Sequence, residues 1–161
     1  MIGSGMMASA LCSTALLAQA PASADVDVCE LVTEEEFQKA QGVDPRIGII
    51  PNAPVLTDMS WGPHCDYSDG SIDLFTKESD LERVLELTKA VKRRDAVQGL
   101  GQRAYFTIVY PGDEYRQRGL LAIFLGPRIL TLTMDDSPDV PVAATRPKLE
   151  GLAKLAVPRL K

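Results

Sequence analysis

One short segment gathers the residue types best suited to recognition or catalysis. Trp61, His64 and Tyr67 lie within seven residues of one another, around Cys65, and the chain holds no other tryptophan or histidine. Aromatic side chains of this kind anchor binding partners when they are exposed. They also commonly cover a disulfide and the core of a small domain. Trp61, His64 and Tyr67 are therefore a candidate recognition surface, with core packing by Trp61 and Tyr67 as the simpler alternative.

Catalysis at this segment would need partners that the sequence does not offer. Nucleophilic chemistry requires a nucleophile, a base within hydrogen-bond reach and a group that orients the base. His64 is the only side chain that ordinarily titrates near neutrality, and no Gly-x-Ser-x-Gly motif occurs. We expect His64 on the rim of a disulfide turn, without a carboxylate partner aligned to a hydroxyl. No catalytic residue is predicted, and the chain is not expected to be an enzyme.

Acidic and glycine-rich clusters have structural roles in this interpretation. Glu34 to Glu36 mark a helix start, and Asp135 to Asp139 form a polar turn. The second cluster lacks the alternating spacing and the distant glutamate of a calcium loop. Gly99-Leu100-Gly101 lacks the further glycine and the basic residue of a phosphate loop. We therefore expect no metal site and no cofactor.

The charge balance excludes a general affinity for nucleic acids. The formal net charge is −5 and the sequence pI is about 4.9, whereas binding to phosphate backbones needs clustered lysine and arginine. One basic cluster occurs at residues 89–94. It can be interpreted as an anion-binding patch or, more simply, as a helix end whose dipole favours positive charge.

The start of the chain has the pattern of a signal peptide. No charged residue precedes Asp25, and an apolar run at residues 6–18 is followed by Ala22-Ser23-Ala24. The run is shorter than the roughly 20 residues that span a bilayer. We predict a signal peptide at residues 1–24, a single domain at 25–161, and a periplasmic or secreted location without an integral membrane span after processing. A disordered tail and a lipid anchor at Cys12 are the alternatives.

The cysteines agree with export. Cys12 leaves with the leader, and Cys29 and Cys65 remain as an even number in an exported chain, which predicts one disulfide. A metal or redox pair fits poorly, because there is no Cys-x-x-Cys and only one histidine. The bridge is expected to stabilise the domain by roughly 3–4 kcal/mol.

Hydrophobic periodicity predicts the elements that must position these residues. We expect helices at about 33–42, 79–94 and 147–160, and strands at about 55–61, 65–68, 71–77, 103–110, 119–125 and 128–134. Runs of strands between isolated helices indicate an α+β fold. The prediction is an antiparallel sheet of about five to six strands with three helices packed on it.

Local signals set the expected boundaries. Thr33 to Glu36 and Ser79 to Glu82 have the capping-box pattern, and Gly42 can close the first helix in the left-handed conformation. Asp69-Gly70 and Gly126-Pro127 predict tight turns between strands. Between them, Ser71 and Asp73 alternate with apolar residues, as expected of a strand with one solvated face. The last helix has an apolar stripe of Leu149, Leu152, Ala153, Leu155 and Ala156.

Several of these segments together carry a family resemblance. They are Cys29-Glu30-Leu31-Val32-Thr33-Glu34-Glu35, Gly42, Cys65-Asp66-Tyr67, Gly99-Leu100-Gly101-Gln102-Arg103-Ala104 and Leu149-Glu150-Gly151-Leu152-Ala153. The chain resembles a group of small bacterial cell-envelope domains, often lipoproteins, that have no assigned function. The resemblance implies an exported α+β domain with its two cysteines bonded, and it carries no catalytic residues. A usable lipid-attachment motif is missing here.

The functional prediction is a non-enzymatic binding or sensor-like accessory domain of the bacterial cell envelope. Its partner would be an unidentified protein or small ligand of that envelope. The alternative is a structural subunit or inhibitor-like partner in a larger envelope assembly. A polar pocket would favour a small ligand, and a flat exposed apolar patch would favour a protein.

Overall fold

The computed structural model describes residues 26–43, 54–111, 117–135 and 141–160. The predicted leader at residues 1–24 lies outside these ranges. In chain order the elements are η1 (Val28–Glu30), α1 (Glu34–Gln41), β1 (Val55–Met59), β2 (Gly62–Tyr67), β3 (Gly70–Phe75), α2 (Glu78–Leu87), β4 (Asp95–Val97), β5 (Arg103–Val109), β6 (Arg118–Leu125), β7 (Arg128–Asp135), η2 (Val142–Ala144) and α3 (Thr145–Arg159).

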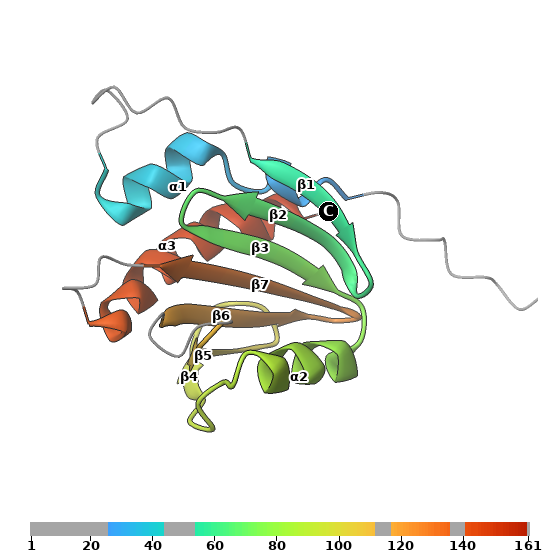
Figure 1. Ribbon diagram of the computed structural model, residues 1–161. Helices are drawn as coiled ribbons and strands as arrows, with labels where there is room; N and C mark the ends of the chain where they lie inside the picture. Colours follow the sequence, from blue (N-terminus) through green and yellow to red (C-terminus); the bar gives the residue numbers. More distant parts are fainter. Residues whose placement is uncertain (1–25, 44–53, 112–116, 136–140, 161) are drawn as a thin grey trace, which may run out of the picture.

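The strands form one antiparallel sheet, as Figure 1 shows, in the order β1-β2-β3-β7-β6-β5-β4. The α+β class with three helices is confirmed for the described residues. The expected count of five to six strands is corrected to seven by β4. This strand has only three residues, and a segment so short carries no readable alternation. None of the described helices is long and apolar enough to cross a membrane.

The two faces of the sheet are covered unequally. Figure 1 shows α3 crossing behind the sheet, while α2 lies on the side of β5 and β6. We call the two faces the α3 face and the α2 face. The α3 face carries the larger core, to which η1, α1 and α3 contribute Val28, Phe37, Leu149 and Leu152. On the α2 face, Leu81 and Leu85 of α2 pack on a smaller cluster that includes Phe75.

Helix α1 begins and ends as its sequence predicts. The Thr33 hydroxyl accepts from the Glu36 amide at 3.2 Å, and the Glu36 carboxylate accepts from the Thr33 amide at 2.9 Å. This reciprocal pair satisfies two amides that the helix leaves without partners. Gly42 closes the helix with φ 86°, a conformation that L side chains rarely adopt.

Helix α2 differs from its prediction at both ends. It begins at Glu78 after Lys77, and no side chain caps it, so the capping box expected at Ser79 is absent. It ends at Leu87 instead of about Arg94. The Thr88 hydroxyl bonds to the carbonyl oxygen of Val84 at 2.8 Å, and Lys89 has a φ of 48°.

Contacts with β5 explain why α2 stops early. The Val91 amide bonds to the Ile108 carbonyl oxygen at 2.8 Å, and the Tyr110 amide bonds to the Thr88 carbonyl oxygen at 2.7 Å. These long-range hydrogen bonds replace further helical ones. The basic cluster at 89–94 therefore lies in a connection to β4, and the expectation that it ends a helix is wrong.

Both predicted hairpins form, but the first turn lies one residue earlier than expected. Tyr67 pairs with Gly70, so Ser68 and Asp69 form that turn in place of Asp69-Gly70. Leu125 pairs with Arg128 across Gly126-Pro127, as predicted. Gly70 has a steric reason to be glycine, because a Cβ there would collide with the Thr133 carbonyl oxygen and the Phe37 ring. In α3 the predicted stripe is buried except at Leu155, which is 40% exposed.

Candidate functional site

A buried polar cluster lies on the α2 face where β2, β3 and β7 meet. The register aligns His64 of β2 with Asp73 of β3, and Asp73 with Thr131 of β7. One pair further along, Ser71 faces Thr133. All five residues are buried, with at most 8% of each exposed. The face of β3 that was expected to be solvated is thus polar but enclosed, and this corrects the alternation argument for Ser71 and Asp73.

Asp73 is the centre of this cluster. Its Oδ1 accepts from Trp61 Nε1 at 3.2 Å and bonds to His64 Nδ1 at 2.7 Å. Its Oδ2 accepts longer hydrogen bonds, both 3.4 Å, from the hydroxyls of Ser71 and Thr131. A buried carboxylate costs several kcal/mol unless such partners compensate for the lost water. The donors around Asp73 therefore satisfy both of its carboxylate oxygens inside the sheet.

His64 lies between two carboxylates. Its Nδ1 faces Asp73, and its Nε2 lies 3.0 Å from Oδ1 of Asp66, whose side chain is 62% exposed. A neutral imidazole donates from only one nitrogen, so it would turn a lone pair toward one of the two aspartates. Only the protonated ring donates to both. Hydrogen bonding to Asp73, with the charges of both aspartates, raises the pKa of His64 against the opposing effect of burial.

The neighbouring hydroxyls do not form a catalytic relay with His64. Ser71 Oγ lies 2.7 Å from Thr133 Oγ1, and its other contact in the cluster is Asp73. Both ring nitrogens of His64 are occupied by carboxylates. The group can hold a charge pair and order three strands. Neither ring nitrogen of His64 faces one of these hydroxyls.

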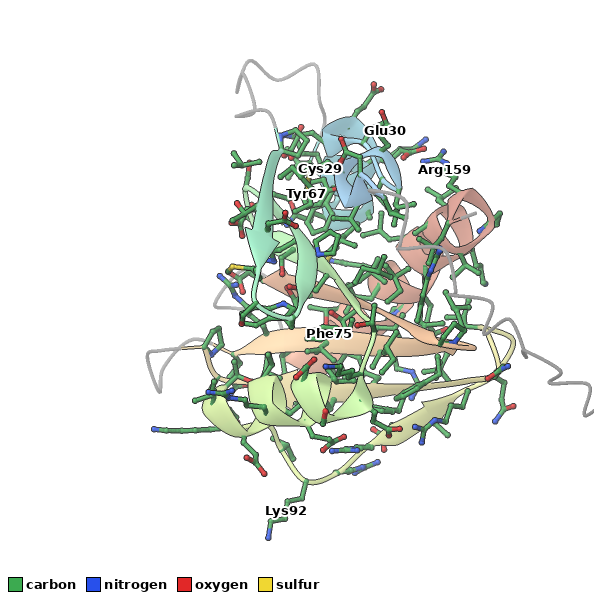
Figure 2. The ribbon with its side chains drawn as sticks, turned by 90° about the vertical axis from the view of Figure 1, so that its right-hand side faces the viewer. Cys29, Glu30, Tyr67, Phe75, Lys92 and Arg159 are labelled. Atoms are coloured by element: carbon green, nitrogen blue, oxygen red, sulfur yellow. A yellow bond between two sulfur atoms is a disulfide. The ribbon has the colours of Figure 1, made fainter. Side chains whose placement is uncertain are left out.

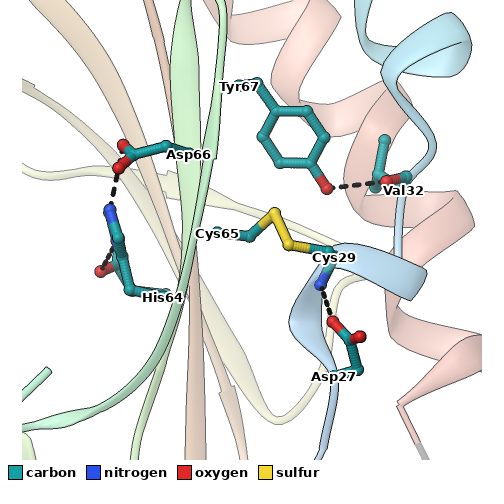
Figure 3. The surroundings of a disulfide bond; sticks show 8 residues. Asp27, Cys29, Val32, His64, Cys65, Asp66 and Tyr67 are labelled. Atoms are coloured by element: carbon teal, nitrogen blue, oxygen red, sulfur yellow. Dashed lines mark hydrogen bonds and ion pairs between the residues drawn. A yellow bond between two sulfur atoms is a disulfide. The ribbon is translucent and has the colours of Figure 1, made fainter. Parts of the chain in front are cut away.

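The predicted recognition residues separate onto opposite faces of β2. Figure 3 shows His64 and Asp66 on one side of the strand and the disulfide and Tyr67 on the other. Tyr67 is 7% exposed, stacks on Phe37 at 4.6 Å between ring centroids, and donates to the Val32 carbonyl oxygen at 2.7 Å. Burial raises its pKa. Tyr67 is a core residue and does not lie on a surface with Trp61 and His64.

His64 also departs from its expected position. It was expected on the rim of the disulfide turn, without a carboxylate partner aligned to a hydroxyl. It is instead only 8% exposed and lies between two carboxylates. The register decides this partner. Ser68 and Asp69 form the turn and Tyr67 pairs with Gly70, which places Asp73 directly opposite His64. A turn at Asp69-Gly70, as expected from the sequence, would pair Ser68 with Ser71 and move Asp73 away from His64.

The predicted disulfide is present. Cys29 and Cys65 are joined with their Cα atoms 5.3 Å apart, and 36 residues separate them in the sequence. Figure 2 shows Cys29 and Tyr67 close together, with Phe75 further along the sheet, near α2. The bridge ties η1 to the centre of β2 and so fixes the strand that carries His64.

Beyond the buried cluster, the α2 face becomes an exposed surface that α2 does not reach. Val55 pairs with Asp66, and Thr57 pairs with His64, so these side chains share that face. Val55 is 57% exposed and Met59 is 37% exposed. Trp61 is half-buried in the turn between β1 and β2, and its ring stacks on that of Phe75 with 6.1 Å between the ring centroids. We call Val55, Thr57, Met59, Trp61 and Asp66 the β1–β2 surface.

Two other features bear on ligand binding. A hollow of about 300 Å³ lies between the β6–β7 turn and the end of α3, and its lining is mainly apolar: Leu125, Pro127, Arg128, Val157 and Leu160. Within the described ranges, no group of three or more histidine, cysteine or acidic residues is arranged to hold a metal ion.

No protein-family model, curated protein or solved structure matches the chain.

Proposed function

We propose that this chain is an exported, non-enzymatic binding domain of the bacterial cell envelope, which recognises a protein partner through the β1–β2 surface. One observation carries the proposal: Val55 and Met59 are exposed on the same sheet face, beside Trp61. Large apolar side chains gathered next to a tryptophan are typical of protein interfaces. Of the three residues predicted for recognition, only Trp61 belongs to this surface. His64 lies in the buried cluster beside it, and Tyr67 lies in the core.

The buried charge pair supports a binding role over a catalytic one. His64, the only neutral-pH base in the chain, is bonded on both sides and holds the strand that presents Asp66. Trp61 is fixed in the same way, since its indole N–H is bonded to Asp73. A recognition side chain held by a rigid network loses little conformational entropy on binding.

Export is supported by two independent features. The leader has the composition of a signal peptide, and disulfides such as Cys29–Cys65 persist mainly in oxidising compartments. The mature protein should begin at or near Asp25. Intact-mass measurement of exported material tests this, and recovery of the uncleaved chain from the cytoplasm would contradict it.

A protein partner fits the geometry better than a small ligand. The hollow at the end of α3 is mainly apolar, whereas small-ligand sites usually add convergent polar groups. A second candidate, a subunit of a larger envelope assembly, is favoured by the position of β1 at the end of the sheet. A sheet edge can continue into the sheet of a neighbour.

The proposal can be tested by comparing surface variants in their native envelope. Mature protein would be captured from the envelope as wild type, as Met59→Glu and as Leu87→Glu. Leu87 is the control, because it is 70% exposed but lies on α2. We expect a partner that is retained by wild type and Leu87→Glu and lost with Met59→Glu. A partner set that is identical in all three samples would refute the β1–β2 surface.

A further inference from the structure

The exposed charges on the half of the sheet that carries the β1–β2 surface are all negative. Residues 54–76 contain no lysine or arginine. Their acidic residues are Asp58, Asp66, Asp69 and Asp73. Asp73 is buried against His64, and the other three are exposed. This half therefore attracts a partner that carries positive charge.

The two edges of the sheet are protected differently. At one edge, β4 has only three residues, and its Ala96 carbonyl oxygen accepts from Arg146 Nη2 at 3.1 Å. Short strands and blocking side chains are the usual protection of an edge. At the other edge, β1 has five residues, and all five are exposed. Alternate residues of an antiparallel strand direct their N–H and C=O groups to opposite sides, so part of the β1 backbone faces away from β2.

The side chains of β1 alternate between the two faces of the sheet. Val55, Thr57 and Met59 lie on the α2 face, and Asp58 lies on the opposite face with Leu56, which is 49% exposed. A strand placed alongside β1 would alternate in the same way. Its residues on the α2 face would meet Val55, Met59 and the neighbourhood of Trp61, and those on the other face would meet Leu56 and Asp58. The matching segment alternates apolar and basic residues.

We infer, on the basis of the proposed function, that the partner supplies an extended segment of alternating apolar and basic residues, which adds to the sheet as a further strand beside β1. Main-chain hydrogen bonds supply affinity in this mode of recognition, and alternate side chains supply specificity. Asp58 selects positive charge on one face, and Val55 and Met59 select apolar side chains on the other.

Synthetic peptides test this inference with the disulfide-bonded mature protein. The probe is a peptide of about nine residues that alternates valine and lysine, long enough to cover β1. One control peptide has glutamate in place of lysine. A second keeps every lysine but has proline at its centre, which removes a strand hydrogen bond. Trp61 is the only tryptophan in the chain, so its fluorescence reports binding at this surface.

We expect the valine–lysine peptide to change the Trp61 emission and both controls to bind at least roughly tenfold more weakly at low salt. Asp58→Lys should weaken the probe by a similar factor. Glu86→Lys, an equal charge change at an exposed position of α2, should not, and circular dichroism would verify that both variants fold. Equal binding of all three peptides, or equal effects of the two variants, would reduce the interaction to unspecific charge attraction and overturn the inference.

Two further outcomes separate the inference from the proposed function. If the probe fails to bind while Met59→Glu still loses an envelope partner, strand addition is wrong and the recognition surface stands. If light scattering shows that the protein alone forms dimers that Asp58→Lys dissociates, a second copy occupies β1. That result would also overturn the inference.

Discussion

His64 and Asp73 lie directly opposite each other on β2 and β3, and His64 Nδ1 is 2.7 Å from Asp73 Oδ1. The pair takes the place that apolar side chains occupy elsewhere on the α2 face. It connects the stability of the three strands to the protonation of one imidazole. It also holds Trp61, because the indole N–H shares the same carboxylate oxygen.

The first prediction concerns the pH dependence of stability. The pKa of His64 is raised in the folded state, chiefly by the hydrogen bond to Asp73, from an ordinary value of 6.5. Its contribution is therefore complete below pH 6.5 and is lost as the pH rises through the folded-state pKa. We expect the stability advantage of wild type over His64→Gln to shrink as the pH is raised above 6.5 and through the folded-state pKa. Urea unfolding across that range measures it, and a constant difference would contradict it.

The second prediction compares the two aspartates that flank His64. Asp73→Asn leaves the buried His64 with only the mostly exposed Asp66 as a carboxylate partner, so it should destabilise by about 3 kcal/mol. Asp66→Asn removes a mostly exposed partner and should cost less than about 1 kcal/mol. Denaturant unfolding of both variants gives the comparison. Equal costs would show that Asp73 is not the centre of the cluster.

The sequence predicts those parts of the fold that depend on interactions between neighbouring residues. The Thr33 capping box, the Gly42 helix end and the Gly126-Pro127 turn depend on neighbouring residues, and all are confirmed. The first hairpin was also predicted, but its turn was placed one residue too late. The end of α2 is set by hydrogen bonds to β5, far away in the sequence, and was predicted wrongly. Burial of Asp73 depends on β7 lying beside β3. The order of the strands decides that, and no periodicity in the chain reports it.

The third prediction concerns the disulfide. The Cys29–Cys65 bridge joins residues that lie 36 positions apart in the sequence. By restricting the unfolded chain, a bridge of this span stabilises the folded state by roughly 3–4 kcal/mol. We expect a Cys29→Ala/Cys65→Ala variant to lose about that much stability. Thermal or denaturant unfolding measures the loss. A variant as stable as wild type would mean that packing of η1 on β2 alone fixes this region.

The fourth prediction concerns the contact between α1 and α3. The Arg159 guanidinium donates to both oxygens of Glu36, each at 2.7 Å, and its hydrogen bond lowers the Glu36 pKa from 4.5 to about 2. The resulting stabilisation is complete above pH 4.5 and is lost as the pH falls through about 2.

Arg159→Gln should therefore unfold at a higher pH than wild type during acid titration. Arg93→Gln is the matched control, because Arg93 is 80% exposed and pairs only two residues away, with Asp95. Its acid transition should stay close to that of wild type. If both variants shift equally, the loss of one positive charge explains the effect and the specific Glu36 contact does not.

The most direct test of the β1–β2 surface is site-specific photo-crosslinking in the intact envelope. A photoreactive amino acid would be placed at Val55 and, separately, at Leu87, which are 57% and 70% exposed on different parts of the molecule. We predict a discrete crosslinked protein from position 55 that is absent from position 87 and disappears with Met59→Glu. Crosslinks of the same pattern from both positions, or none from position 55, would contradict a recognition role for this surface.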